Sequence, residues 1–247
     1  MTHDSTVPKL HSLVRSLALR DKVSPEERDL IEGMTIRRRT LRRGEELVAQ
    51  HSRPSESCIV LSGFTAREVV LDDGKRQITA LHIPGDFVDL HAFLLKVMDH
   101  SVVALTDCEA AYVPHRELLR VIDRSAHLGR LFWLSTVIDG AIQRAWITSS
   151  GRRAATAHLG HLICELYLRL QAVDLARDGS FTFPVPQAEL ADALGFSLVH
   201  VNRTLQELRA TGFVRWKGSA ITIIDFDGLA ELSQFDPTYL NLITLPR

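Results

Sequence analysis

The chain has 247 residues, 45% of them hydrophobic and 24% charged, which is typical of a globular protein with one large domain or two smaller ones. Its formal net charge of −1 creates no overall field that attracts nucleic acid, so DNA binding would depend on locally placed Arg and Lys. Three widely spaced cysteines argue against a disulfide framework, and no apolar run reaches the roughly 18 residues of a membrane helix. Residues 1–14 lack a leader pattern, so we expect a cytoplasmic protein without a membrane partner.

After an N-terminal helical segment, the first third of the chain has the pattern of short β-strands. Apolar and β-branched runs are separated by Gly44, Gly63, Gly74 and Gly85. The clearest hairpin covers residues 67–81, where an Asp-Gly pair supplies the positive φ that a tight turn needs. A short helix is expected at residues 89–95, before strands resume at 101–106 and 110–113. The pattern predicts a small antiparallel sandwich or barrel, and therefore an α+β protein.

A long helix follows, and its apolar and small residues recur at spacings of three and four. The stripe consists of Leu128, Leu131, Ser135, Ile138, Ile142 and Ala145. It predicts a parallel homodimer joined through this helix, and the alternative is a core helix of a monomer. The helix-poor residues 149–151 predict a break and a hinge, after which a second helix covers 152–175 and is closed by residues 178–180.

Residues 187–225 carry the most specific motif in the chain. A first helix over 187–194 buries Leu190 and Leu194, Gly195 supplies a sharp turn, and Ser197 is placed to cap a second helix over about 198–210. Two short strands then bracket Lys217-Gly218. This order of elements predicts a winged helix-turn-helix.

The residues expected to touch DNA lie on the outer face of the second helix and on the wing. Arg can donate two hydrogen bonds to guanine and Asn can pair with adenine, so Asn202 and Arg203 are the predicted base readers. Arg209, Arg215 and Lys217 are expected to contact phosphates. The predicted DNA-binding set is Ser197, Leu198, Val199, His200, Asn202, Arg203, Gln206, Arg209 and Lys217.

Taken together, the chain resembles the Crp/Fnr superfamily of bacterial transcription regulators over nearly its full length. The residues that carry the resemblance are Gly44-Glu45, Gly63, Gly74, the Pro84–Phe87 turn, and GFSLVHVNRTLQEL in the recognition segment. The resemblance implies an antiparallel β-roll of cyclic-nucleotide-binding type with N-terminal helices over 1–124, a dimerisation helix and hinge over 125–150, and a winged helix-turn-helix with a C-terminal tail over 151–247. It also implies a homodimer on a two-fold symmetric operator.

Departures from the family pattern fall in the expected effector pocket, which comprises Asp89, Leu90, His91, His100 and Ser101. Members that bind cyclic AMP carry Gly-Glu-Leu and then Arg-Ser at the matching positions, so the resemblance leaves this pocket without a fixed cation for the phosphate. We therefore expect no tight cyclic AMP binding. The chain has no cysteine before Cys58, so no Fnr-type iron-sulfur cluster is expected, while haem stays open through His82, His91 or Cys108.

Three groups of polar residues each have both a functional and a purely structural interpretation. The even spacing of His82, His91 and His100 suggests a metal or haem ligand set, but a spacing of nine is no ligand geometry, and ordinary polar positions are the prediction. His158, His161 and Glu165 could present zinc ligands, although an exposed polar face is simpler. The arginines at 37–39 and 42–43 are expected to form a solvated strand edge, or a contact for a partner such as RNA polymerase.

No catalytic motif is present: the chain has no GxSxG elbow, phosphate-binding glycine loop or HExxH. We predict a sequence-specific DNA-binding regulator and no enzyme, with no metal or cofactor assigned. Its β-roll would sense an unidentified small-molecule signal. The alternatives are a regulator controlled by abundance or by a protein partner, without a ligand.

Overall fold

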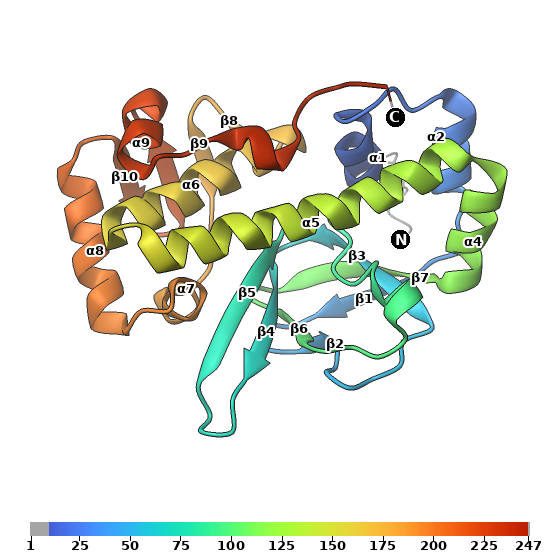
Figure 1. Ribbon diagram of the computed structural model, residues 1–247, viewed down its shortest axis with the longest axis horizontal. Helices are drawn as coiled ribbons and strands as arrows, with labels where there is room; N and C mark the ends of the chain where they lie inside the picture. The colour runs from blue at the N-terminus through green and yellow to red at the C-terminus, as the bar shows by residue number, and fades with distance from the viewer. Residues whose placement is uncertain (1–9, 247) are drawn as a thin grey trace, which may run out of the picture.

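The N-terminal part of the computed structural model forms a pair of short helices, which lie beside residues 115–134 (Figure 1). The structure describes residues 10–246, so most of the segment predicted to lack a leader lies outside the described residues. Helix α1 covers His11–Ala18 and α2 covers Pro25–Glu32. A capping box between Ser24 and Glu27 fixes the start of α2, because each side chain accepts a hydrogen bond from the backbone N–H of the other residue.

Two small antiparallel sheets follow and pack as the predicted sandwich of short strands. Their orders are β1-β7-β3 and β2-β6-β4-β5. The strands are β1 (Arg37–Leu41), β2 (Glu46–Val48), β3 (Glu56–Ser62), β4 (Thr65–Val70), β5 (Arg76–His82), β6 (Ser101–Ala104) and β7 (Cys108–Pro114). The predicted hairpin is confirmed as β4–β5, with Gly74 at φ +80° in its turn, and the predicted short helix is α3 (Ala92–Leu95).

Helices α4 (His115–Arg124) and α5 (Ala126–Arg152) leave the sandwich, and α5 crosses the whole molecule (Figure 1). Its 27 residues give a length of about 40 Å. The N-terminal half packs through Leu128, Leu131 and Phe132 into a core shared with α1 and α4. The C-terminal half packs through Ile138 and Ile142 into a core to which both the sandwich and the C-terminal domain contribute.

The predicted helix break at residues 149–151 is wrong. Helix α5 continues to Arg152, and the chain turns instead at Arg153, where φ is −82° and ψ is 146°. Ser149 is fully buried, and its Oγ lies 2.6 Å from Nδ1 of His158 on the next helix. Helix propensity differs by only about 1 kcal/mol per residue, so this packing overrides the unfavourable Ser-Ser-Gly sequence.

The C-terminal domain has the order of elements that the motif predicts. It contains α6 (Ala155–Ala172), β8 (Ala176–Arg177), β9 (Ser180–Thr182), α7 (Gln187–Leu194), α8 (Leu198–Ala210), β10 (Val214–Lys217), β11 (Ala220–Ile223), α9 (Phe226–Ser233) and the 3-10 turn η1 (Pro237–Leu240). Its sheet order is β10-β11-β9-β8. The helix predicted over 152–175 is shorter in the structure, because α6 ends at Ala172 and the β8–β9 hairpin begins at Ala176. No helix among residues 10–246 is long and apolar enough to span a membrane.

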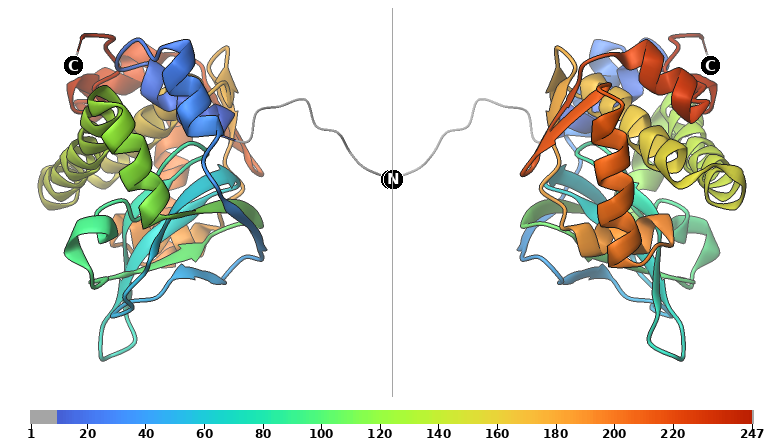
Figure 2. Two further views of the ribbon diagram at one scale, coloured as in Figure 1. Left: turned by 90° about the vertical axis from the view of Figure 1, so that its right-hand side faces the viewer. Right: turned by 90° about the vertical axis from the view of Figure 1, so that its left-hand side faces the viewer.

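Ion pairs link the sandwich to the C-terminal domain at two places. Arg76 on β5 donates to Asp192 and Glu189 of α7, with 2.8 Å between its Nε and Asp192 Oδ2. Arg169 on α6 is buried and donates both to Asp86 at 2.7 Å and to the carbonyl oxygen of Leu81 at 2.9 Å. Helix α7 therefore lies against strand β5 of the β4–β5 hairpin. Helix α8 lies at the front in the right-hand view of Figure 2.

Candidate DNA-binding surface and sensor pocket

The turn between α7 and α8 is built as the sequence predicts. Helix α7 ends at Gly195, which has φ +68°, a left-handed conformation that favours glycine. Ser197 then caps α8 and accepts a hydrogen bond from His200 N at 3.2 Å. Val201, Leu205 and Leu208 face the domain core, so the opposite side of α8 points outward.

The outer face of α8 is accessible along its whole length. Val199 is 81% exposed, and all other members of the predicted DNA-binding set are exposed except His200, which stacks on Phe196 with ring centroids 4.2 Å apart. Asn202 Nδ2 donates to the Leu198 carbonyl oxygen at 3.0 Å, and Arg203 Nε lies 3.7 Å from Glu207. Both contacts lie on the exposed side of α8, so each side chain can leave its partner and extend into solvent.

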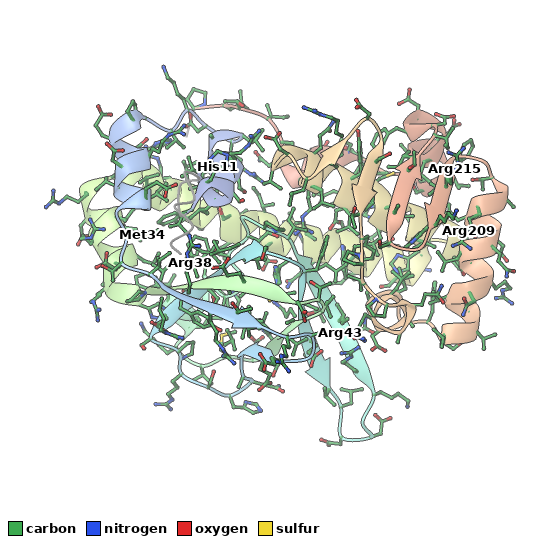
Figure 3. The ribbon with its side chains drawn as sticks, turned by 180° about the vertical axis from the view of Figure 1, so that it is seen from behind. His11, Met34, Arg38, Arg43, Arg209 and Arg215 are labelled. Carbon is green, nitrogen blue, oxygen red and sulfur yellow. The ribbon has the colours of Figure 1, made fainter. Side chains whose placement is uncertain are left out.

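The β10–β11 hairpin provides the predicted wing next to α8. Lys217 pairs with Ala220 at its tip, and Trp216 Nε1 donates to the carbonyl oxygen of Gly218 at 3.0 Å, which holds the turn. Arg215 is exposed on β10 and Arg209 on α8 (Figure 3). Three basic side chains therefore flank the outer face of α8, as phosphate contacts beside a major-groove helix require.

The predicted dimer stripe on α5 is largely wrong in register. Leu128, Leu131, Ile138 and Ile142 are buried inside the single chain, and Ser135 and Ala145 are half-buried beside them. A second apolar row lies on the opposite face, where Trp133 is 71% exposed and Ile147 is 70% exposed, with Val137 between them. Periodicity alone cannot distinguish these rows, because the members of each row lie on one face of the helix, and only the fold decides which face the chain covers.

A cavity of about 630 Å³ lies between the β4–β5 hairpin, α5 and α7, where the family pattern places an effector. His91 and His100 line it, as predicted. Asp89, Leu90 and Ser101 do not line the cavity: Leu90 packs towards the N-terminal helices, and Ser101 Oγ donates to Glu46 at 2.8 Å. Asp89 is fully buried beneath the wall, accepts from Cys58 N at 2.6 Å, and has its pKa raised to about 7 by burial.

The expectation that this pocket lacks a fixed cation is also wrong, because β4 supplies Arg67. Arg67 is 4% exposed and lines the cavity, and one of its terminal nitrogens donates to Asp139 of α5 at 2.8 Å. Thr65 and Arg67 are two residues apart on one strand and therefore point to the same face of the sheet. The sequence did not show that this face is the inner one. Since the Asp139 carboxylate already pairs with this guanidinium, the absence of tight cyclic AMP binding stays a prediction.

Histidines at the cavity and near it have lowered pKa values. Burial lowers the pKa of His100 to about 4, and the neighbouring Arg67 charge acts in the same direction. Burial likewise lowers the pKa of His91, and it lowers that of His82 well below the usual value. Each imidazole therefore keeps a lone pair available at neutral pH.

The expected exposed face at His158, His161 and Glu165 is wrong, because all three are buried. His158 contacts Ser149, and His161 stacks on Tyr239 with ring planes 9° apart. Glu165 accepts from Trp146, Tyr239 and Arg169 at 2.8–3.0 Å. Their partners are structural, so the fold does not gather them as metal ligands.

The arginine-rich strand β1 is an edge strand, as predicted, and Figure 3 labels Arg38 on it. Arg37 pairs with Glu56 at 2.7 Å and Arg38 with Glu109 at 3.2 Å. Arg43 pairs with Glu189 of α7 at 3.0 Å. These charges are locally balanced, which fits a solvated edge more closely than a nucleic-acid surface.

Comparison with known proteins agrees with both halves of this arrangement. Residues 38–125 match the cyclic nucleotide-binding domain, and residues 157–232 match the Crp-like helix-turn-helix domain. A probable transcriptional activator of Rhizobium leguminosarum bv. viciae is 29% identical over 196 residues, which are 79% of this chain and 80% of that protein. The transcriptional activator protein FnrL of Cereibacter sphaeroides is 25% identical over 78% of this chain and 79% of its own length.

The solved structure of FixK2 from Bradyrhizobium japonicum has the same fold, with a TM-score of 0.70, 22% identity, and coverage of 81% of this chain and 98% of that chain. The sandwich, the crossing helix, the winged helix-turn-helix and the two domain matches lead to one conclusion. The chain belongs to the Crp/Fnr superfamily of transcription regulators, with a cyclic nucleotide-binding-like domain followed by a DNA-binding helix-turn-helix.

Proposed function

We propose that this regulator reads a specific operator by inserting α8 into the major groove, with Asn202 and Arg203 contacting base edges. The observation that carries the proposal is the division of α8 into a buried apolar side and an exposed side that carries Asn202, Arg203 and Gln206, next to an exposed basic wing. Arg209, Arg215 and Lys217 contact phosphates on either side of the groove. The protein acts in the cytoplasm and is not an enzyme.

The functional unit is a homodimer on a two-fold symmetric operator. The support is the uncovered apolar row on α5, since Trp133, Val137 and Ile147 form a line that a second copy of the same helix would cover. Two copies of α8 would then lie about one turn of DNA apart on half-sites related by symmetry. The cavity between the sandwich and α5 receives the signal, a ligand other than cyclic AMP, and transmits it through α5.

Selection of bound DNA from a random pool tests the mode of binding. We expect sites with two-fold symmetry for the unchanged protein, and a relaxed preference at one position of each half-site for Arg203→Ala, with a loss of about 1–3 kcal/mol. Arg177→Ala is the matched control, because Arg177 is exposed at the opposite edge of the same sheet from the wing. Asymmetric sites, or an unchanged base preference in Arg203→Ala, would contradict the proposal.

A further inference from the structure

Three potential metal ligands meet at the wall of the sensor cavity. One ligand atom each from His91, Asp99 and His100 lies within 4.8 Å of the others, and no other group of three such residues gathers in the described part of the chain. His91 directly precedes α3, and Asp99 and His100 directly precede β6. The turn between them includes Lys96 with φ +67°, which reverses the chain and brings the two imidazole rings to 5.1 Å between centroids.

The Nε2 atoms of both imidazoles at this point have no hydrogen-bond partner among residues 10–246. His100 is 5% exposed, its Nδ1 lies 2.7 Å from Asp99 Oδ1, and its Nε2 has no hydrogen bond. The Nε2 atom of His91 is also buried and without a hydrogen bond. An unsatisfied buried polar atom destabilises the folded state, so two of them on neighbouring rings in one cavity indicate a missing ligand.

The chemistry of these groups favours a cation over an anion. Neutral imidazole nitrogen and carboxylate oxygen are both ligands that divalent transition metals bind in proteins. The buried cation in this cavity, Arg67, is already paired with Asp139 at 2.8 Å. An anionic ligand would have to compete with both the Asp139 and the Asp99 carboxylates.

We propose that His91, His100 and Asp99 bind a divalent transition-metal ion of the zinc, cobalt or nickel type in the sensor cavity. Ligand atoms of a tetrahedral site lie about 3.4 Å apart, so closure requires side-chain movements of about 1 Å. Asp99 can make the largest of these, because its side chain is 78% exposed. At least one coordination position stays open towards the cavity for water or a signal molecule.

The ion would lie beside the Arg67–Asp139 pair, which joins β4 to α5. Its charge repels the guanidinium and attracts the carboxylate, so binding would weaken this link between the sensor and the crossing helix. This regulatory role rests on the proposed function, whereas metal binding itself does not. Binding is therefore measured on the full chain in the absence of DNA.

The experiment titrates Co²⁺ into untagged, chelator-treated protein, follows the visible ligand-field bands, and then displaces Co²⁺ with Zn²⁺. We expect one ion per chain. His100→Gln and His91→Gln should each weaken binding at least about tenfold. His115→Gln is the matched control, because this histidine of the same domain lies outside the cluster and contacts Ser57 at 3.2 Å, and it should bind as the unchanged protein does.

Asp99→Asn keeps the test valid if a buried-histidine variant fails to fold, because Asp99 is exposed and its amide has the same shape. It should also weaken binding at least about tenfold. The proposal is overturned if the unchanged protein binds no Co²⁺ below about 1 mM, or if Asp99→Asn and every folded histidine variant bind normally. Metal binding by a protein that selects no DNA sequence would refute the proposed function and leave this site standing.

Discussion

At the scale of single residues, the most informative feature is a set of buried histidines. His158 and His161 on α6 each have a pKa lowered to about 4, because burial disfavours the charged ring and Arg153 adds to the effect. In the unfolded chain, histidine titrates near 6.5. The unfolded chain therefore binds more protons between about pH 6.5 and 4, and the free energy of unfolding falls as the pH is lowered through this window.

We expect His161→Phe to reduce this loss of stability on acidification. Phenylalanine keeps the stacking on Tyr239 but cannot take up a proton in either state. Urea unfolding at pH 7 and at pH 5 should give a smaller difference for the variant than for the unchanged protein. His51→Asn, which changes an exposed histidine at φ +63° to a residue that tolerates this conformation, serves as the control. Equal differences for His161→Phe and the unchanged protein would contradict the assignment.

Asp89 also titrates in this range, because burial raises its pKa to about 7. Its protonation increases the free energy of unfolding as the pH falls, which is opposite to the effect of the histidines. This contribution is the same in all three proteins, so it does not change the comparison.

At the scale of elements, α5 has two apolar rows with different tasks. The row with Leu128, Leu131, Ile138 and Ile142 ties the helix to the cores of both domains, while residues 10–246 leave the row with Trp133 and Ile147 exposed. The first row therefore contributes to folding, and the second is the surface available for association.

Two substitutions separate these tasks. Trp133→Ala should weaken self-association at least about tenfold and leave the free energy of unfolding of the monomer nearly unchanged, because aromatic anchors dominate interfaces. Ile142→Ala should lower the free energy of unfolding by about 2–5 kcal/mol and leave the dimer dissociation constant unchanged. Sedimentation equilibrium and chemical denaturation measure the two quantities. If Ile142→Ala weakened self-association and Trp133→Ala lowered the free energy of unfolding, the row with Leu128 and Ile142 would be the dimer surface instead.

At the scale of the whole molecule, the ionic links between the domains differ in burial. Arg169 is buried with Glu165 and also pairs with Asp86, whose side chain is 25% exposed, whereas the Arg76 side chain is itself 26% exposed beside Glu189 and Asp192. Removing one partner of a buried pair leaves the others uncompensated, but solvent screens a partly exposed pair.

Arg169→Ala should therefore lower the free energy of unfolding by about 3–5 kcal/mol, and Arg76→Ala by only about 0.5–1 kcal/mol. Denaturation in urea at neutral pH measures both. Arg177→Ala, an exposed arginine of the same domain as Arg169, should stay within about 0.5 kcal/mol of the unchanged protein. A small effect of Arg169→Ala would show that water reaches Glu165 and Asp86 once the guanidinium is gone.

The sequence by itself determined the local structures, because their signals are local. The hairpin at Asp73-Gly74, the cap at Ser197, the turn at Gly195 and the bounds of α7 and α8 all follow from conformational preferences that neighbouring residues carry. The accessible face of α8 follows in the same way, since the buried face of a helix fixes the other one.

Only the tertiary structure decided which surfaces meet. The fold chose the covered row of α5, kept the helix intact through Ser149, buried His158, His161 and Glu165, and placed Arg67 and His91 beside Asp99 and His100. These outcomes depend on contacts between residues far apart in the chain. Packing of that kind outweighs the small propensities and periodicities that a sequence displays, so no local pattern could have revealed it.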